Sequence, residues 1–284
     1  MKQGSNHQHF LTVYDHSVSH EEFSLQIDKE LDLVYTNPQP ESDKLSSYYE
    51  SEDYISHTDS KRSWFERTYQ IVKTLAIKNK IGLVNRLQER KGTLLDIGAG
   101  TGDFLIKAKD VGWEILGVEP SEKARSLALS KGVTIIENTE ILEDHSVDVI
   151  TMWHVLEHVP DIEKQIKELK RLLKPSGTIL IAVPNFNSFD AKHYGTYWAA
   201  YDVPRHLWHF SRTAMHKLFA REKLQVQKER PLVFDAFYVA LLSEKYKTGS
   251  INLINGFRIG LQSNWSARKT KEYSSVIYEI RNMP

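Results

Sequence analysis

Between residues 93 and 184 the chain alternates short apolar runs with segments that carry apolar residues at helical spacing. A short apolar run bounded by turn residues is typical of a buried strand, whereas a period of about 3.6 residues is typical of a helix packed on one face. Strands are expected at 93–98, 113–119, 133–137, 147–153 and 178–184, and helices at 103–111, 121–130 and 161–173. This alternation predicts an α/β fold with a doubly wound, largely parallel sheet and helices on both faces.

The first of these strands runs directly into DIGAGTGDF, residues 96–104. Doubly wound sheets bind ligands beyond the carboxyl ends of their strands, so a ligand is expected at this turn. Its three glycines allow a tight turn and leave no Cβ between the backbone and a ligand. Asp103 stands where a dinucleotide-binding turn has Gly or Ala, and its charge would oppose a pyrophosphate. The sequence therefore favours a ligand without phosphates here and disfavours a nicotinamide dehydrogenase.

Polar side chains also follow the next two predicted strands. Glu119 ends the second strand, where a carboxylate can accept hydrogen bonds from the hydroxyls of a ribose. Asn138 and Thr139 follow the third strand, where a side-chain amide can read the edge of an adenine through its donor and its acceptor. The alternatives are a solvated acid at a strand end and ordinary polar loop residues.

Composition excludes several classes of protein and site. Lys and Arg together number 37, as do Asp and Glu, so no basic excess indicates nucleic acid as the partner. The chain has no cysteine, which rules out disulfides, thiolate zinc sites and cysteine nucleophiles. The first residues lack the pattern of a signal peptide, and no run is long enough for a membrane-spanning helix. We expect a cytoplasmic protein without a membrane span.

Four segments in this order resemble the class I S-adenosylmethionine-dependent methyltransferases: LLDIGAGTGDF, GVEPS, VDVITMWHVLEHVPD and LLKPSGTILIAVPN. The resemblance covers about residues 90–185, and the LEHV block is similar to the branch that includes ubiquinone-pathway O-methyltransferases. It implies a Rossmann-like sheet of seven strands whose last strand is antiparallel. SSVIYEIRN near the C-terminus suits that strand, and LQVQKER suits the one before it.

The resemblance implies S-adenosylmethionine as the cofactor, with the glycine turn beside its methionine part and Glu119 on its ribose. A sulfonium needs aromatic faces and carbonyl groups rather than a phosphate clamp, and Trp153 and His154 follow the fourth strand at a suitable place. Core packing is the alternative for this segment. The candidate cofactor-binding residues are Asp96, Gly98, Ala99, Gly100, Gly102, Glu119, Pro120, Asn138, Thr139, Trp153 and His154.

An insertion at about residues 186–210 follows the fifth strand and ends in YDVPRHLWHF. Its position over the carboxyl edge of the sheet predicts that it lines the pocket of the methyl acceptor, and its aromatic residues suit a ring or an apolar chain. Histidine can take a proton from the acceptor, and Arg205 can hold an acceptor carboxylate or phosphate. The catalytic candidates are His206, His209 and His154, and the substrate-binding candidates are Arg205, Tyr197, Trp198 and Tyr201.

Structural roles are the alternative for the same residues. Asp202 can pair with Arg205, and His209 can cap a helix that begins near Ser211. Glu157 and His158 could form part of a metal site, but a charge cluster at a helix start is the simpler interpretation. A metal site in the insertion would need a third convergent ligand, and no metal is expected.

Residues 1–60 are expected to form an N-terminal extension, and residues 61–284 the methyltransferase domain, which opens with a helix at 63–88. No long periodic element is evident in the extension. Its YYESEDYISH segment could close over the cofactor as a lid and bring Tyr48, Tyr49 or Tyr54 to the pocket. By resemblance, the extension is the remnant of a zinc module without its cysteines. The extension also holds four irregularly spaced histidines that are expected to face solvent or to be disordered: His7, His9, His16 and His20.

The function predicted from these features is methyl transfer from S-adenosylmethionine to an O, N or C atom of a small molecule, with S-adenosylhomocysteine as the product. The alternative is a protein of the same fold that binds the cofactor or a partner without turnover.

Overall fold

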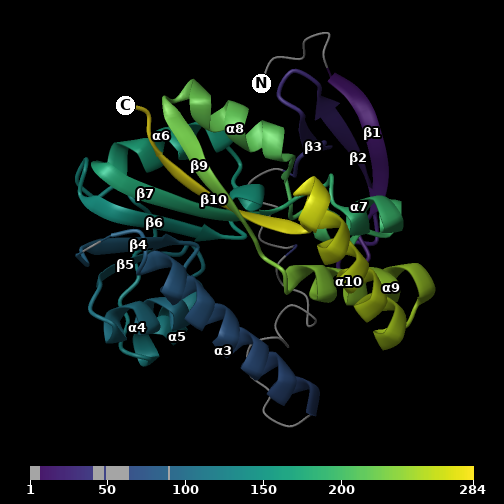
Figure 1. Cartoon of the computed structure of the whole chain (residues 1–284), viewed down its shortest axis with the longest axis horizontal. Coiled ribbons are helices and arrows are strands. Elements are labelled where there is room, and N and C mark those ends of the chain that lie inside the picture. Colours follow the sequence, from purple (N-terminus) through teal and green to yellow (C-terminus); the bar gives the residue numbers. More distant parts are fainter. Residues whose placement is uncertain (1–6, 41–47, 49–63, 89) are drawn as a thin grey trace.

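The computed structural model describes residues 7–40, 48, 64–88 and 90–284. Its larger sheet has six strands in the order β5-β4-β6-β7-β10-β9 (Figure 1). Neighbours among β4, β5, β6 and β7 are parallel, whereas β10 is antiparallel to both β7 and β9. The predicted antiparallel last strand is therefore confirmed. The bounds are β4 (Thr93–Ile97), β5 (Glu114–Val118), β6 (Val147–Trp153), β7 (Leu173–Pro184), β9 (Leu224–Pro231) and β10 (Ser275–Asn282).

The strand predicted at residues 133–137, the third in chain order, is reduced to one bridge between Val118 and Ile136. Within the described part of the chain, the sheet therefore has six strands instead of the expected seven. The amide of Ile136 donates to the carbonyl of Gly117, and its carbonyl accepts from the amide of Glu119. The segment thus lies beside β5 without forming a longer ladder. Val133 and Ile135 are nevertheless buried, which is the apolar pattern that predicted a strand.

Helices cover both faces of this sheet, as predicted. Alternate residues of β7 divide between two cores: Ile179 and Ile181 face one, and Leu180 and Ala182 face the other. Helices α6 (Ile162–Leu172) and α8 (Arg212–Arg221) pack into the first core, and α3 (Trp64–Val84) and α4 (Asp103–Asp110) into the second. Helix α5 (Glu122–Ser130) follows β5 and has Ser121 as its N-cap, as expected.

The N-terminal segment forms strands, which corrects the expectation that it lacks regular elements. Strands β1 (His7–Tyr14), β2 (Glu22–Asp28) and β3 (Leu33–Asn37) pair with β8 (Trp208–Phe210) in the order β1-β2-β3-β8. The alternation of Phe23, Leu25 and Ile27 with polar residues was the available signal for a half-buried strand. The extension and the end of the insertion therefore share one sheet.

Two of the four N-terminal histidines also depart from the expected solvent-facing position. The ring of His16 stacks on Tyr246 with centroids 4.6 Å apart, and the ring of His7 meets Tyr35 edge to face at 5.6 Å. Tyr49 and Tyr54, predicted for a lid, lie outside the described residues. Of Tyr48, the structure shows that its carbonyl accepts a hydrogen bond from Arg205 at 3.3 Å.

The insertion after β7 and the two helices between β9 and β10 form a cap beside the N-terminal sheet (Figure 1). Within it the carboxylate of Asp190 is fully buried and accepts hydrogen bonds from Trp198, Ser263 and Ser274. These bonds join the insertion to two later segments of the chain. The cap itself consists of α7 (Phe189–Tyr194), η3 (Gly195–Tyr197), η4 (Ala199–Tyr201), α9 (Asp235–Thr248) and α10 (Leu253–Thr270).

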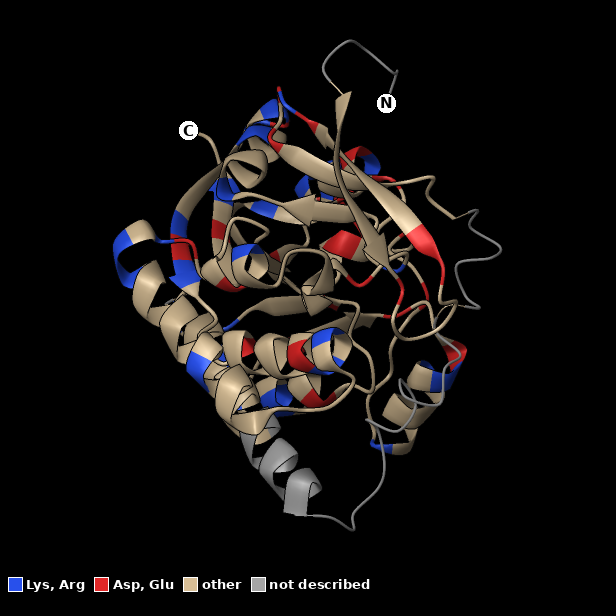
Figure 2. Cartoon of the chain, turned by 90° about the vertical axis from the view of Figure 1, so that its right-hand side faces the viewer, with Lys and Arg blue, Asp and Glu red and all other residues tan. Residues whose placement is uncertain are grey.

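Positions of Lys and Arg alternate with positions of Asp and Glu along the ribbon in Figure 2, in keeping with the equal totals of acids and bases. No helix among the described residues combines the length and the apolar character needed to cross a bilayer.

Candidate active site

The glycine turn after β4 is shaped to admit a ligand. Gly98, Gly100 and Gly102 have φ angles of +72°, +54° and +76°, a region that residues with a Cβ avoid. A Cβ on Gly98 would lie 2.4 Å from a methyl carbon of Val155, whereas a Cβ on Gly100 would meet nothing within 4 Å. The backbone at Gly100 therefore borders open space, at the place where the sequence predicts the cofactor.

Glu119 lies at the carboxyl end of the neighbouring strand and is held against this turn. One carboxylate oxygen accepts the amide of Gly100 at 3.0 Å, and the other accepts the amide of Ser121 at 2.9 Å. Each carboxylate oxygen has a second lone pair, so Glu119 can still accept hydrogen bonds from ribose hydroxyls. The residues at this edge of the sheet thus fit the nucleoside of S-adenosylmethionine. Pro120, the exposed residue that follows, offers only its carbonyl, which accepts a bond from Arg125.

Asp96 is buried at the end of β4 and accepts a hydrogen bond of 2.6 Å from Thr151. Burial raises the pKa of Asp96 to about 7, although the Thr151 bond and the charge of Lys80 lower it. Lys80 of α3 places its ammonium 4.5 Å from the ring centre of Trp153, a cation–π contact. Sequence reasoning missed Lys80, although it interrupts the apolar stripe of Ile77, Ile81 and Val84.

His154 follows β6 with a φ of +58° and lies between two carboxylates. Its Nδ1 is 3.2 Å from Glu157 and its Nε2 is 2.9 Å from Asp235. Burial by itself lowers the pKa of His154, but the charges and hydrogen bonds of Asp235 and Glu157 outweigh burial and raise it to about 10. These two ion pairs favour the charged imidazolium, which does not favour the predicted catalytic role of His154.

Trp153 and the two residues after the third predicted strand have less uniform surroundings. Trp153 is partly buried, and its Nε1 has no hydrogen-bond partner among the described residues. Asn138 is exposed and accepts the amide of Glu140. The hydroxyl of Thr139 donates to Glu168 of α6 at 2.5 Å, so this group is already engaged within the protein. Trp153 and Asn138 remain predicted contacts of the cofactor.

His209 is a core residue, which does not favour its predicted catalytic role. It is 4% exposed, and its Nε2 lies 3.2 Å from the hydroxyl of Thr36. Burial holds the pKa of His209 well below its ordinary value, so the ring is neutral. Nor does it cap α8, because Ser211 accepts the amide of Ala214 at 2.9 Å.

Most residues predicted to bind the acceptor have partners within the protein. Trp198 and Tyr201 are 2% and 3% exposed and belong to the core under the N-terminal sheet, which does not favour their predicted contact with the acceptor. Arg205 is 5% exposed and forms a two-bond ion pair with Asp202, the structural alternative noted above. Tyr197 is 39% exposed and stays a predicted acceptor contact.

A small hollow of about 210 Å³, open to solvent, lies on the N-terminal sheet rather than at the glycine turn. Asp15, Thr196 and Tyr246 are part of its lining, as are Asp202 and Arg205. Asp202 and Arg205 of the insertion therefore border this hollow.

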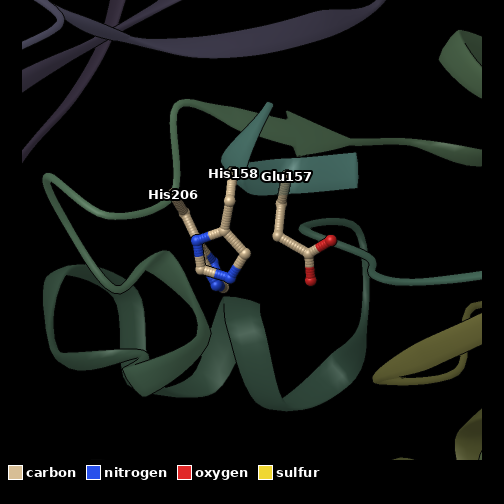
Figure 3. Close-up of side chains that lie close together, drawn as sticks. All are labelled: Glu157, His158 and His206. Atoms are coloured by element: carbon tan, nitrogen blue, oxygen red, sulfur yellow. The ribbon is translucent and has the colours of Figure 1, made fainter. Parts of the chain in front are cut away.

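The fold brings His206 beside Glu157 and His158 (Figure 3). The three residues each offer one ligand atom, and these atoms lie within 4.8 Å of one another. The backbone holds the segments together, since the amide of Leu207 donates to the carbonyl of Glu157 at 2.8 Å. The third convergent ligand that sequence reasoning did not expect is therefore present.

Comparisons with known proteins identify the family of the chain. A family model described as a methyltransferase domain matches residues 66–229, which is more than half of the chain. The ubiquinone biosynthesis O-methyltransferase of Proteus mirabilis is 32% identical over 119 residues, covering 37% of this chain and 49% of that protein. The enzyme of the same name from Paraburkholderia phymatum is 34% identical over 104 residues, covering 33% and 45%. The chain thus matches about half the length of these curated relatives.

Solved structures share the fold. Geranyl diphosphate C-methyltransferase from Streptomyces coelicolor has a TM-score of 0.55 at 14% identity, covering 85% of this chain and 97% of that chain. A possible histamine N-methyltransferase from Thermotoga maritima has a TM-score of 0.51 at 22% identity, covering 75% and 92%. The family resemblance seen in the sequence is confirmed. The chain belongs to the methyltransferase-domain family, and it shares the fold of solved S-adenosylmethionine-dependent methyltransferases.

Proposed function

We propose that the protein transfers the methyl group of S-adenosylmethionine to an oxygen of a small-molecule acceptor. One observation supports this most strongly: the open backbone at Gly100 lies beside a carboxylate that two backbone amides hold in place. The choice of oxygen follows the names of the curated relatives, which are O-methyltransferases. Bound S-adenosylmethionine would supply a methyl group on a positively charged sulfur.

The protein's own residues would mainly bind and align the reactants, because methyl transfer is an in-line displacement that depends on proximity. Glu119 would accept bonds from the ribose, and Trp153 would present its aromatic face. Of the three predicted catalytic histidines, only His206 keeps suitable chemistry. Its Nδ1 donates to the carbonyl of Ala200 at 2.9 Å, so Nε2 is the nitrogen that can carry a lone pair, where a proton or a cation can bind.

The cofactor half of the proposal is tested by calorimetry with S-adenosylmethionine and, separately, with NAD. Binding at roughly micromolar concentrations is expected for S-adenosylmethionine alone. Glu119→Ala should weaken this binding about 100-fold, the loss of two hydrogen bonds to a carboxylate worth ~3 kcal/mol in all. Glu114→Ala is the matched control, since Glu114 is an exposed acid at the other end of β5. Equal affinities of the two variants would contradict the role of Glu119.

The transfer half is tested with methyl-labelled S-adenosylmethionine and a panel of phenols, amines and apolar alcohols. Label in a phenol or alcohol is the expected result. Label only in amines would overturn the choice of oxygen. Tight cofactor binding without transfer to any acceptor would favour the alternative, a binding protein without turnover.

A further inference from the structure

Glu157, His158 and His206 form the most unusual side-chain cluster outside the cofactor-binding turn. From their geometry we propose that they hold a divalent transition-metal ion of the zinc type, next to the methyl acceptor. Two imidazoles and one carboxylate are a common ligand set for such ions, and three protein ligands leave a position for another oxygen.

Both histidines are held in the form that binds metals. The carbonyl of Arg205 accepts a hydrogen bond from Nδ1 of His158 at 3.0 Å, as the carbonyl of Ala200 does from Nδ1 of His206. A carbonyl only accepts, so in each neutral ring Nδ1 carries the proton and Nε2 carries the lone pair. Such bonds to the outer nitrogen are the usual second shell of metal-binding histidines. The rings lie nearly perpendicular, with centroids 4.6 Å apart.

The carboxylate provides an independent indication. Glu157 is 0% exposed, and its Oε2 has no hydrogen-bond partner among the described residues. Its other oxygen is held by His154, which Asp235 anchors in turn. A buried carboxylate oxygen without a partner carries a large desolvation cost, and a cation would remove that cost.

The dimensions require only a small adjustment. Ligand atoms about 2.1 Å from a tetrahedral ion lie roughly 3.4 Å apart, so atoms within 4.8 Å would close by up to about 1.4 Å. His158 is the one member of the cluster that is only partly buried.

The place of the cluster connects it with the acceptor, a link that rests on the proposed function. Glu157 follows β6 two residues after Val155, whose side chain borders Gly98 of the cofactor-binding turn. Coordination lowers the pKa of a hydroxyl, which then releases its proton to water. The oxygen forms a bond to the methyl carbon as the carbon–sulfur bond breaks, and its electron pair stays on the sulfur.

The test uses the full chain, freed of metal with a chelator and titrated with Zn²⁺ in competition with a chromophoric chelator. We expect a single tight site and much weaker binding of Mg²⁺, which disfavours imidazole ligands. His158→Gln and His206→Gln should each weaken Zn²⁺ binding at least roughly 100-fold, more than changes outside the ligand set usually cost. His216→Gln is the matched control, because His216 of α8 lies outside the cluster and pairs with Glu229 of β9 at 2.9 Å.

A thermal shift gives a second readout that does not depend on activity. Zn²⁺ should raise the melting temperature of the wild type and of the control, but not of the two ligand variants. The proposal is overturned if all four proteins bind Zn²⁺ equally, or if Mg²⁺ binds as tightly as Zn²⁺. Calorimetry of S-adenosylmethionine on the metal-free protein separates this failure from a failure of the proposed function.

Discussion

Replacing Arg205 by alanine is expected to destabilise the protein rather than weaken acceptor binding alone. The guanidinium pairs with Asp202 through two hydrogen bonds and donates to Ser17 at 2.5 Å and to the carbonyl of Tyr48 at 3.3 Å. It also lies 3.8 Å from the carboxylate of Asp15, which is 2% exposed. Arg205 thus joins the insertion to the turn between β1 and β2.

The size of the effect follows from burial. Removing one partner of a buried ion pair costs about 3–5 kcal/mol, because the remaining charge keeps its desolvation penalty. The side chain of Asp202 is 27% exposed, and Asp15 keeps five hydrogen bonds from Ser17, Val18 and Ser19, which places the expected loss near the lower value, ~3 kcal/mol. That is a large share of the ~5–15 kcal/mol that stabilises a typical domain.

Urea unfolding followed by circular dichroism measures the loss. Arg221→Ala is the matched control: Arg221 pairs with Glu163 at 3.6 Å, but both side chains are about half exposed, so at most ~0.5 kcal/mol should be lost. The double variant Asp202→Asn/Arg205→Met should recover part of the stability, since it leaves no unpaired charge at this pair. If Arg205→Ala unfolds like the wild type while the KM of the acceptor rises, the guanidinium binds an acceptor anion and this reasoning is refuted.

Two further predictions concern the cofactor-binding turn. Gly98→Ala should abolish detectable S-adenosylmethionine binding and should cost more stability than Gly132→Ala. Both positions have a positive φ, but only at Gly98 would a Cβ press against a neighbour. Equal losses of stability in urea unfolding would contradict the expected clash with Val155. Asp96→Asn should remove a pH dependence of the free energy of unfolding. Because the pKa of Asp96 is raised from 3.8 to about 7, the folded protein binds a proton that the unfolded chain has released. Stability of the wild type therefore falls by up to about 4 kcal/mol as pH rises between these values. Urea unfolding at about pH 5 and about pH 8 should show that the stability of the variant relative to the wild type is greater at the higher pH. An equal difference in stability at both pH values would rule this out.

The alternation of strands and helices was sufficient to predict the central sheet. Periodicity identifies an element when one face packs on a core, and β4, β6, β7 and α6 have strongly one-sided or fully apolar patterns. The reduced strand at 133–137 shows the limit of this reasoning. Its apolar residues pack inward as predicted, but pairing along a ladder depends on a neighbour that the local sequence does not encode.

The cofactor-binding turn was also readable from sequence, because its residues are consecutive and glycine has local backbone consequences. The states of the histidines were not readable. His154 is held as a cation because Asp235, which follows it by 81 positions in the chain, lies 2.9 Å away. His209 is a core residue because β3 pairs with β8. A side chain's pKa and exposure depend on which distant segments surround it, and only the fold decides that.

The sequence by itself therefore determined the family and most of the main sheet, and it predicted where the cofactor binds, since these depend on local patterns in a continuous stretch. The tertiary structure alone decided how the acceptor side is built. It buried Trp198 and Tyr201, paired Arg205 with Asp202, and brought His206 to Glu157 and His158. Glu157 and His206 are separated by 49 positions along the numbering, and the hydrogen bond between the backbones of Glu157 and Leu207 helps to bring them together.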